Sequence, residues 1–214
     1  MHEILHFLKT LTRPEGLAGL AQSMGSSLYV VLFLIVFAET GLVVTPFLPG
    51  DSLLFTVGAV CATGGIKIAV VIPLLIVAAV VGDAVNYAVG LRVGPAVFKS
   101  ERSRLFNKQH LLRTQEFFDR YGGKTIIMAR FVPIVRTFAP FVAGIGRMGY
   151  AKFLAYNVIG AVAWVLVCVL SGAWFGNLEI VRKHFELVLI AIIGISVLPM
   201  VIEFVRARRA PPAA

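Results

Sequence analysis

The sequence predicts an all-α integral membrane protein, a helical bundle with two opposed broken hairpins in an inverted repeat. Three observations indicate this fold class. Of the 214 residues, 58% are hydrophobic and only 14% are charged, whereas soluble domains carry about 25% charged residues. Several apolar blocks reach the length of about 20 residues that a membrane-spanning helix needs. Two of those blocks are interrupted by proline, glycine and charge. One soluble core of this size cannot bury so much apolar surface, so a soluble monomer is excluded.

Residues 1–26 are predicted to form an amphipathic segment at the membrane interface. Four apolar side chains recur there at helical spacing, and Pro14 with Gly16 ends that helix. They are Ile4, Phe7, Leu8 and Leu11. The start of the chain lacks the basic residues and the long apolar core of a secretory signal. The sequence leaves open whether this segment lies on the membrane or enters it.

The first apolar block, residues 28–63, is predicted to form a helix, a break and a second helix. Proline inside a helix removes a hydrogen bond and clashes with the preceding turn, so the chain must break around residues 45–51. Irregular backbone at membrane depth is stable only where protein buries it or where it lines a wet cavity. We therefore expect a broken or re-entrant hairpin. The residues that cause the break are Pro46, Pro49 and Gly50.

The next segments repeat this pattern. Residues 68–89 are predicted to span the membrane, and residues 91–124 form a basic stretch that the positive-inside rule places in the cytoplasm. Residues 125–148 form a second broken block. Its predicted breaks are Pro133, Pro140 and Gly144.

Two further spans, residues 153–175 and 185–205, complete the predicted transmembrane domain, which covers residues 27–205 as one unit. The arginine-rich tail, residues 206–214, then lies on the same side as the basic stretch, so the two basic regions agree on a cytoplasmic location. Counting the membrane crossings from these cytoplasmic regions places the two broken blocks on opposite sides of the membrane. A net charge of +9 is explained by this topology, and no nucleic-acid motif accompanies it.

The two broken blocks also resemble each other in sequence. Pro46-Phe47 and Gly50 match Pro140-Phe141 and Gly144 at one common offset. Interrupted hydrophobic segments in corresponding halves of a membrane protein indicate a transporter binding site. Gly90 and Gly172 each begin a Gly-x-x-x-Gly pattern, which predicts close helix packing.

Five ionisable residues lie in apolar surroundings: Glu39, Asp51, Asp83, Arg130 and Arg136. Insertion scales assign about 2.5–3.5 kcal/mol to each charge near the bilayer centre, so five unpaired charges would cost on the order of 12–17 kcal/mol. They must therefore be paired, neutralised or hydrated. Three acids against two bases allow pairing with one proton retained.

The arginines are candidate anion ligands, because a guanidinium group matches phosphate oxygens in a bidentate fork. Glu39, Asp51 and Asp83 are candidate proton-coupling residues, since carboxyl groups in desolvated sites are suited to carry protons. A structural salt-bridge cluster that locks the hairpins together explains the same residues. No cofactor, metal site or catalytic nucleophile–base pair is predicted, so the chain is not expected to be an enzyme.

Four motifs identify a family. They are Glu39-Thr-Gly; Pro46-Phe-Leu-Pro49-Gly-Asp51-Ser-Leu-Leu; Gly82-Asp83-x-x-Asn86-Tyr87-x-x-Gly90; and Arg130-Phe-Val-Pro133-Ile-Val-Arg136-Thr-Phe-Ala-Pro140-Phe-Val-Ala-Gly144. Over about residues 25–205 the chain resembles the DedA family of bacterial inner-membrane proteins, which are related to the VTT lipid scramblases. One departure is that Leu91 stands directly after Gly90, where the family often has arginine.

The resemblance implies a multi-pass protein of the bacterial inner membrane that transports lipid phosphates, notably undecaprenyl phosphate, with dependence on the proton gradient. It implies that Glu39 and Asp51 are the membrane acids and that Arg130 and Arg136 are the essential arginines. The expected partners are therefore an anionic lipid (a polyprenyl phosphate or a phospholipid) and protons, and a homo-oligomer is left open. A transporter of small oxyanions such as selenite and a non-transporting membrane protein with a structural charge cluster are the alternatives.

Overall fold

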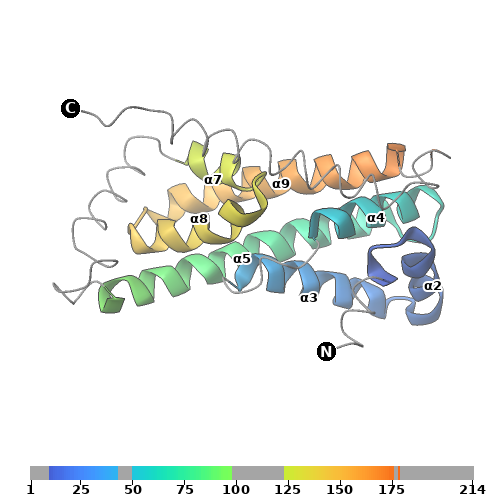
Figure 1. The fold of residues 1–214 in the computed structure, drawn as a ribbon, viewed down its shortest axis with the longest axis horizontal. Coiled ribbons are helices and arrows are strands. Elements are labelled where there is room, and N and C mark those ends of the chain that lie inside the picture. The colour runs from blue at the N-terminus through green and yellow to red at the C-terminus, as the bar shows by residue number, and fades with distance from the viewer. Residues whose placement is uncertain (1–9, 43–49, 98–122, 176–177, 179–214) are drawn as a thin grey trace, which may run out of the picture.

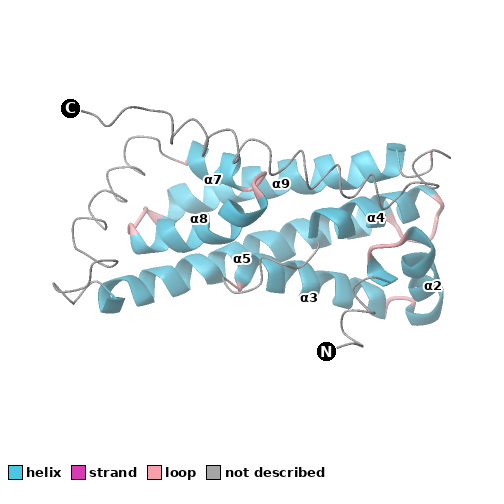
Figure 2. Cartoon of the chain, in the orientation of Figure 1, coloured by secondary structure: helices cyan, strands magenta, loops and turns pink. Residues whose placement is uncertain are grey.

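The computed structural model describes residues 10–42, 50–97, 123–175 and 178 (Figure 1). Every regular element in these ranges is a helix (Figure 2), which confirms the predicted all-α fold. In chain order the helices are α2 (Pro14–Met24), α3 (Ser27–Gly41), α4 (Gly50–Ala62), α5 (Ile68–Val97), α7 (Lys124–Ala129), α8 (Pro133–Ile145) and α9 (Tyr150–Phe175).

Two long helices, α5 and α9, run in opposite directions along the length of the molecule (Figure 1). They alone in the described ranges are long and apolar enough to cross a membrane, over Ile68–Val93 and Tyr150–Phe175. Helix α5 continues to Val97, beyond the predicted end of the span at residue 89. The predicted span 185–205, most of the basic stretch 91–124 and the tail 206–214 lie outside the described residues.

Each broken block contributes two helices (Figure 1). Helices α3 and α4 lie toward one end of the molecule and α7 and α8 toward the other, so the end of α3, the start of α4 and the loop between α7 and α8 all lie near the middle. Gly50 is the first residue of α4 and Pro133 the first of α8, after an extended Val132. Pro46 and Pro49 lie outside the described residues.

The structure corrects two of the predicted breaks, because Pro140 and Gly144 both lie within α8. Proline in a helix frees a carbonyl in the preceding turn, and in membranes a neighbouring helix can supply the missing donor. The carbonyl that Pro140 leaves without its helical donor is that of Arg136, four residues earlier. The next carbonyl, that of Thr137, accepts a hydrogen bond from Asn86 Nδ2 of α5 at 2.7 Å.

Four glycines allow α4 and α8 to pack closely against the long helices α9 and α5. In α4, Gly58 lies against the carbonyl of Val169, and Gly172 of α9 lies against the carbonyl of Phe55. The same arrangement recurs between α8 and α5. There, Gly144 lies against the carbonyl of Tyr87, and Gly90 lies against that of Phe141. The predicted close packing at Gly90 and Gly172 is thus present.

These contacts place the repeat in a different register from the one predicted. Phe55-x-x-Gly58 in α4 makes the contacts that Phe141-x-x-Gly144 makes in α8. The packing therefore pairs Gly58, and not Gly50, with Gly144. The predicted match paired Gly50, which begins α4, with Gly144, which lies within α8 and packs against α5.

Replacing Gly172 by Ala should lower the unfolding temperature of the protein in detergent, because the new Cβ would collide with the backbone of α4 at Phe55. Overpacking of this kind costs about 1–3 kcal/mol. Gly19→Ala is the matched control, since a Cβ on this exposed residue of α2 meets nothing within 4 Å. Equal unfolding temperatures for both variants would contradict the close approach of α4 and α9.

The N-terminal segment packs on the bundle. Leu11 and Leu17 are fully buried in the core, and Thr56 Oγ1 of α4 donates to the carbonyl of Thr12 at 2.9 Å. Pro14 begins helix α2, which the sequence analysis did not predict. The rest of the protein therefore covers the Leu11 side chain. Residues 1–9 lie outside the described residues.

Candidate functional site

The five charged residues that the sequence places in apolar surroundings form two adjoining clusters, one around Arg136 and one around Arg130. Arg136, in the second turn of α8, connects two acids from the other broken block. Its Nη1 donates to Asp51 Oδ1 at 2.6 Å, and its Nη2 donates to Glu39 Oε1. Asp51 comes from the first turn of α4 and Glu39 from the last turn of α3. Arg136 therefore joins α8 both to the end of α3 and to the start of α4.

Arg130 lies between α7 and α8 and binds a different set of partners. Its Nη2 donates to Asp83 Oδ2 of α5 and to Asn157 Oδ1 of α9 at 2.6 Å. All three side chains are buried. Removing one partner from a buried ion pair typically costs about 3–5 kcal/mol, because the other charge is left uncompensated.

Trp164 of α9 connects the two arginine sites. The guanidinium carbons of Arg130 and Arg136 lie 5.8 and 5.0 Å from the centre of its ring, both over the aromatic face. Its Nε1 donates to Asp51 Oδ1 at 2.7 Å. Cation–π attraction in a desolvated site is worth about 2 kcal/mol or more, so the indole stabilises both cations as well as the Asp51 carboxylate.

Two buried asparagines tie the surrounding helices together. Asn86 Nδ2 donates to the carbonyls of Thr40 and Thr137, at 3.2 and 2.7 Å. Asn157 Nδ2 donates to the carbonyl of Val80 at 3.1 Å while its oxygen accepts from Arg130. A small cavity opens beside this network, lined by Thr40, Asp83, Ile126, Arg130, Arg136, Pro140 and Trp164. Arg136 Nε is buried without a hydrogen-bond partner in the described structure.

Comparison with known proteins assigns the family. The VTT domain matches residues 48–174. The protein DedA of Escherichia coli is 51% identical over 91% of this chain and 90% of its own length. The chain belongs to the DedA family of VTT-domain proteins. An uncharacterized membrane protein of Mycobacterium tuberculosis is 43% identical over 87% of the chain and 82% of its own length.

A second member of the DedA family from Escherichia coli, the inner membrane protein YqjA, is 36% identical over 76% of this chain and 74% of its own length. No solved structure gives a significant match. The VTT match contains four of the five buried charges, and Glu39 lies before it.

The structure of this DedA-family chain brings all five predicted site residues into one region, but it divides them into two sets. Arg136 pairs with Glu39 and Asp51, and Arg130 pairs with Asp83. In the described ranges, no group of three His, Cys, Asp or Glu side chains is arranged to hold a metal ion.

Sequence reasoning missed Trp164, Asn86 and Asn157. Asn86 was quoted only as part of a family motif, although an amide in an apolar span indicates a polar contact between helices. The same signal was available for Asn157. Trp164 carried no distinguishing signal, because a tryptophan in an apolar helix is typical of lipid-facing and core positions alike.

Proposed function

We propose that this protein is a proton-linked transporter of an anionic lipid phosphate, with undecaprenyl phosphate as the cargo that fits best. The observation that carries the proposal is the Arg136 guanidinium, which is buried where the two broken segments meet. It holds two carboxylates while its Nε has no partner. Guanidinium groups bind carboxylate and phosphate oxygens with the same fork geometry, so a phosphate can take the place of a carboxylate.

The charge balance of the site supports a link to protons. Three acids face two arginines, so the fully ionised cluster carries one excess negative charge. An entering anion would add to that excess, and charge in a membrane interior is costly. Proton uptake by one of the acids, Glu39, Asp51 or Asp83, offsets one negative charge of the entering anion. Anion entry and proton entry are then thermodynamically linked.

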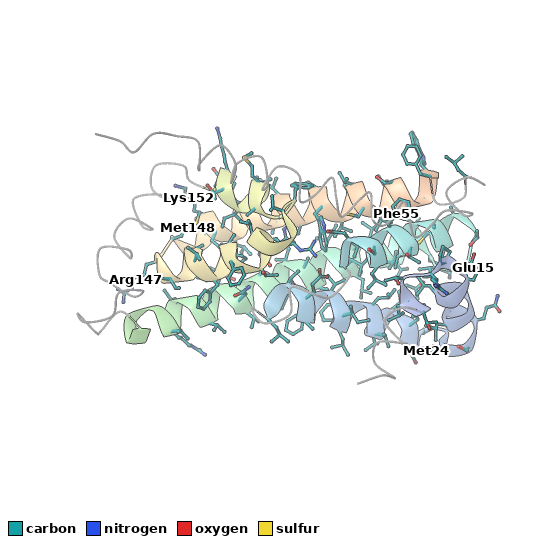
Figure 3. The ribbon with its side chains drawn as sticks, in the orientation of Figure 1. Glu15, Met24, Phe55, Arg147, Met148 and Lys152 are labelled. Carbon is teal, nitrogen blue, oxygen red and sulfur yellow. The ribbon has the colours of Figure 1, made fainter. Side chains whose placement is uncertain are left out.

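We further propose that the chain crosses the bacterial inner membrane several times, with the end that carries Arg147 and Lys152 in the cytoplasm (Figure 3). The relative YqjA is named an inner membrane protein. Exposed basic residues among those described at that end support this orientation, because cytoplasmic loops carry excess Lys and Arg. They are Arg92, Lys124, Arg147 and Lys152.

This orientation predicts which introduced cysteines react with impermeant thiol reagents in intact cells. Lys67→Cys, in the loop between α4 and α5, should be labelled, and Lys152→Cys should be labelled only after the cells are opened. Both positions are exposed, and the background carries Cys61→Ala and Cys168→Ala. The reverse labelling pattern would invert the topology.

The lipid cargo is tested by comparing two ligands with the purified protein. A polyprenyl phosphate should bind, and inorganic phosphate should bind more weakly, because buried apolar surface of the tail adds affinity. Equal affinity for both would favour the alternative of a small-oxyanion transporter that uses the same charges. No binding of either would favour a structural charge cluster in a non-transporting protein.

A further inference from the structure

We infer, on the basis of the proposed function, that a phosphate oxygen of the cargo binds where Asp51 Oδ1 now lies. Trp164 is then an anion-binding residue, and Asp51 is an internal competitor for the same position. The inference rests on two N–H donors that converge on one oxygen. Arg136 Nη1 and Trp164 Nε1 reach Asp51 Oδ1 at 2.6 and 2.7 Å.

These two donors form an anion site independently of Asp51. Hydrogen bonds from a charged donor to a charged oxygen are short and strong, and an indole N–H placed beside a guanidinium supplies the second donor. The Arg136 guanidinium is itself held in place by Glu39, which accepts from Nη2, so the site does not depend on Asp51 alone.

Asp51 is the carboxylate best placed to leave. Its side chain is 15% exposed, whereas those of Glu39 and Asp83 are 1% and 6% exposed. It also lies in the first turn of α4, where the helix dipole stabilises a negative charge. Asp51 can therefore give up its contact with Arg136 and Trp164 and still keep a favourable electrostatic environment.

The chain offers a direct spectroscopic test, because it contains only two tryptophans. Trp174, at the end of α9, is 81% exposed, so Trp174→Phe leaves Trp164 as the single fluorophore without touching the site. Titration of this variant with inorganic phosphate, and separately with a polyprenyl phosphate, should give a saturable change in Trp164 emission. The change is expected because the ligand replaces the carboxylate on the indole N–H.

Calorimetry on matched variants gives the second readout. Trp164→Phe keeps an aromatic ring but removes the N–H donor, so affinity for the bound phosphate should fall about tenfold, the typical value of a hydrogen bond to a charged group. Trp174→Phe should bind within about twofold of the wild type. Asp51→Asn removes the charge of the competitor, and it should bind about tenfold more tightly.

The outcomes separate this inference from the proposed function. Binding by the wild type with no change in Trp164 emission, and equal affinity in Trp164→Phe, would overturn the inference and leave the transporter proposal intact. A Trp164 response to inorganic phosphate with none to the lipid would support the inference and overturn the lipid cargo. If neither ligand binds the wild type, both fail. Should Trp164→Phe not fold, the emission of Trp164 in the Trp174→Phe variant decides the question.

Discussion

Arg136→Lys is expected to abolish transport nearly as fully as Arg136→Ala. The arginine reaches Asp51 and Glu39 with two different nitrogens, and a lysine ammonium is a compact charge without a planar fork. A lysine could keep one ion pair, but it could not bridge both acids or present a fork to a phosphate. Arg130→Lys should behave similarly, because a lysine ammonium cannot present the planar fork that binds two phosphate oxygens.

The measurement is transport of a fluorescent polyprenyl phosphate in proteoliposomes, with protein content matched between variants. We expect at least a hundredfold loss for both lysine variants, the equivalent of about 2.7 kcal/mol. Arg147→Lys is the control, since Arg147 is exposed and outside the cluster. Full transport by both Arg130→Lys and Arg136→Lys would exclude the phosphate-fork assignment.

Glu39→Gln and Asp51→Asn are expected to uncouple anion binding from pH. In the empty protein Arg136 holds both carboxylates. When an anion takes over that guanidinium, a carboxylate loses its cation and should accept a proton. Linkage requires the reverse as well, so anion binding should tighten as pH falls while the headgroup stays charged. An amide mimics the protonated acid and cannot release the proton. At least one of the two variants should therefore bind with a weaker pH dependence and transport poorly.

The affinity for a polyprenyl phosphate, measured across the near-neutral pH range for the wild type and both variants, tests this coupling. Titration of the headgroup itself is measured separately and subtracted. If the pH dependence is as steep in both variants as in the wild type, neither acid is the coupling site. The cluster would then be structural.

Much of the fold could be predicted because membrane helices are encoded locally. Long apolar runs specified α5 and α9, and the run of Pro46, Pro49 and Gly50 required an interruption before α4. The error at Pro140 has a physical cause. A membrane helix can continue through a proline where packing against neighbouring helices compensates for the lost bond, and those neighbours are not encoded in the local sequence. Helix α2 was not predicted because Pro14 indicated only the end of the preceding helix, although proline is also favoured at the first helical position.

The site was predictable only in part. Five charges in an apolar setting must find partners, so their clustering followed from energetics alone. Which acid pairs with which arginine depends on tertiary arrangement. Arg130 and Arg136 lie close in sequence, yet they bind carboxylates from different helices. Trp164 connects them through ring and N–H contacts that spacing does not encode.

The glycine contacts determine which parts of the molecule can move as rigid bodies. Helix α4 packs against α9, and α8 packs against α5. In each half of the chain, a short helix therefore packs against the long helix of the other half. The two sequence halves are interleaved and cannot rock against each other as separate blocks. We therefore expect any motion to keep α4 with α9 and α8 with α5, as an α4–α9 body and an α5–α8 body. Among the described residues, Asp51 with Arg136 is the ion pair that directly joins α4 to α8. An anion that displaces Asp51 would therefore remove this link between α4 and α8, while the hydrogen bond from Asn157 of α9 to the carbonyl of Val80 of α5 remains.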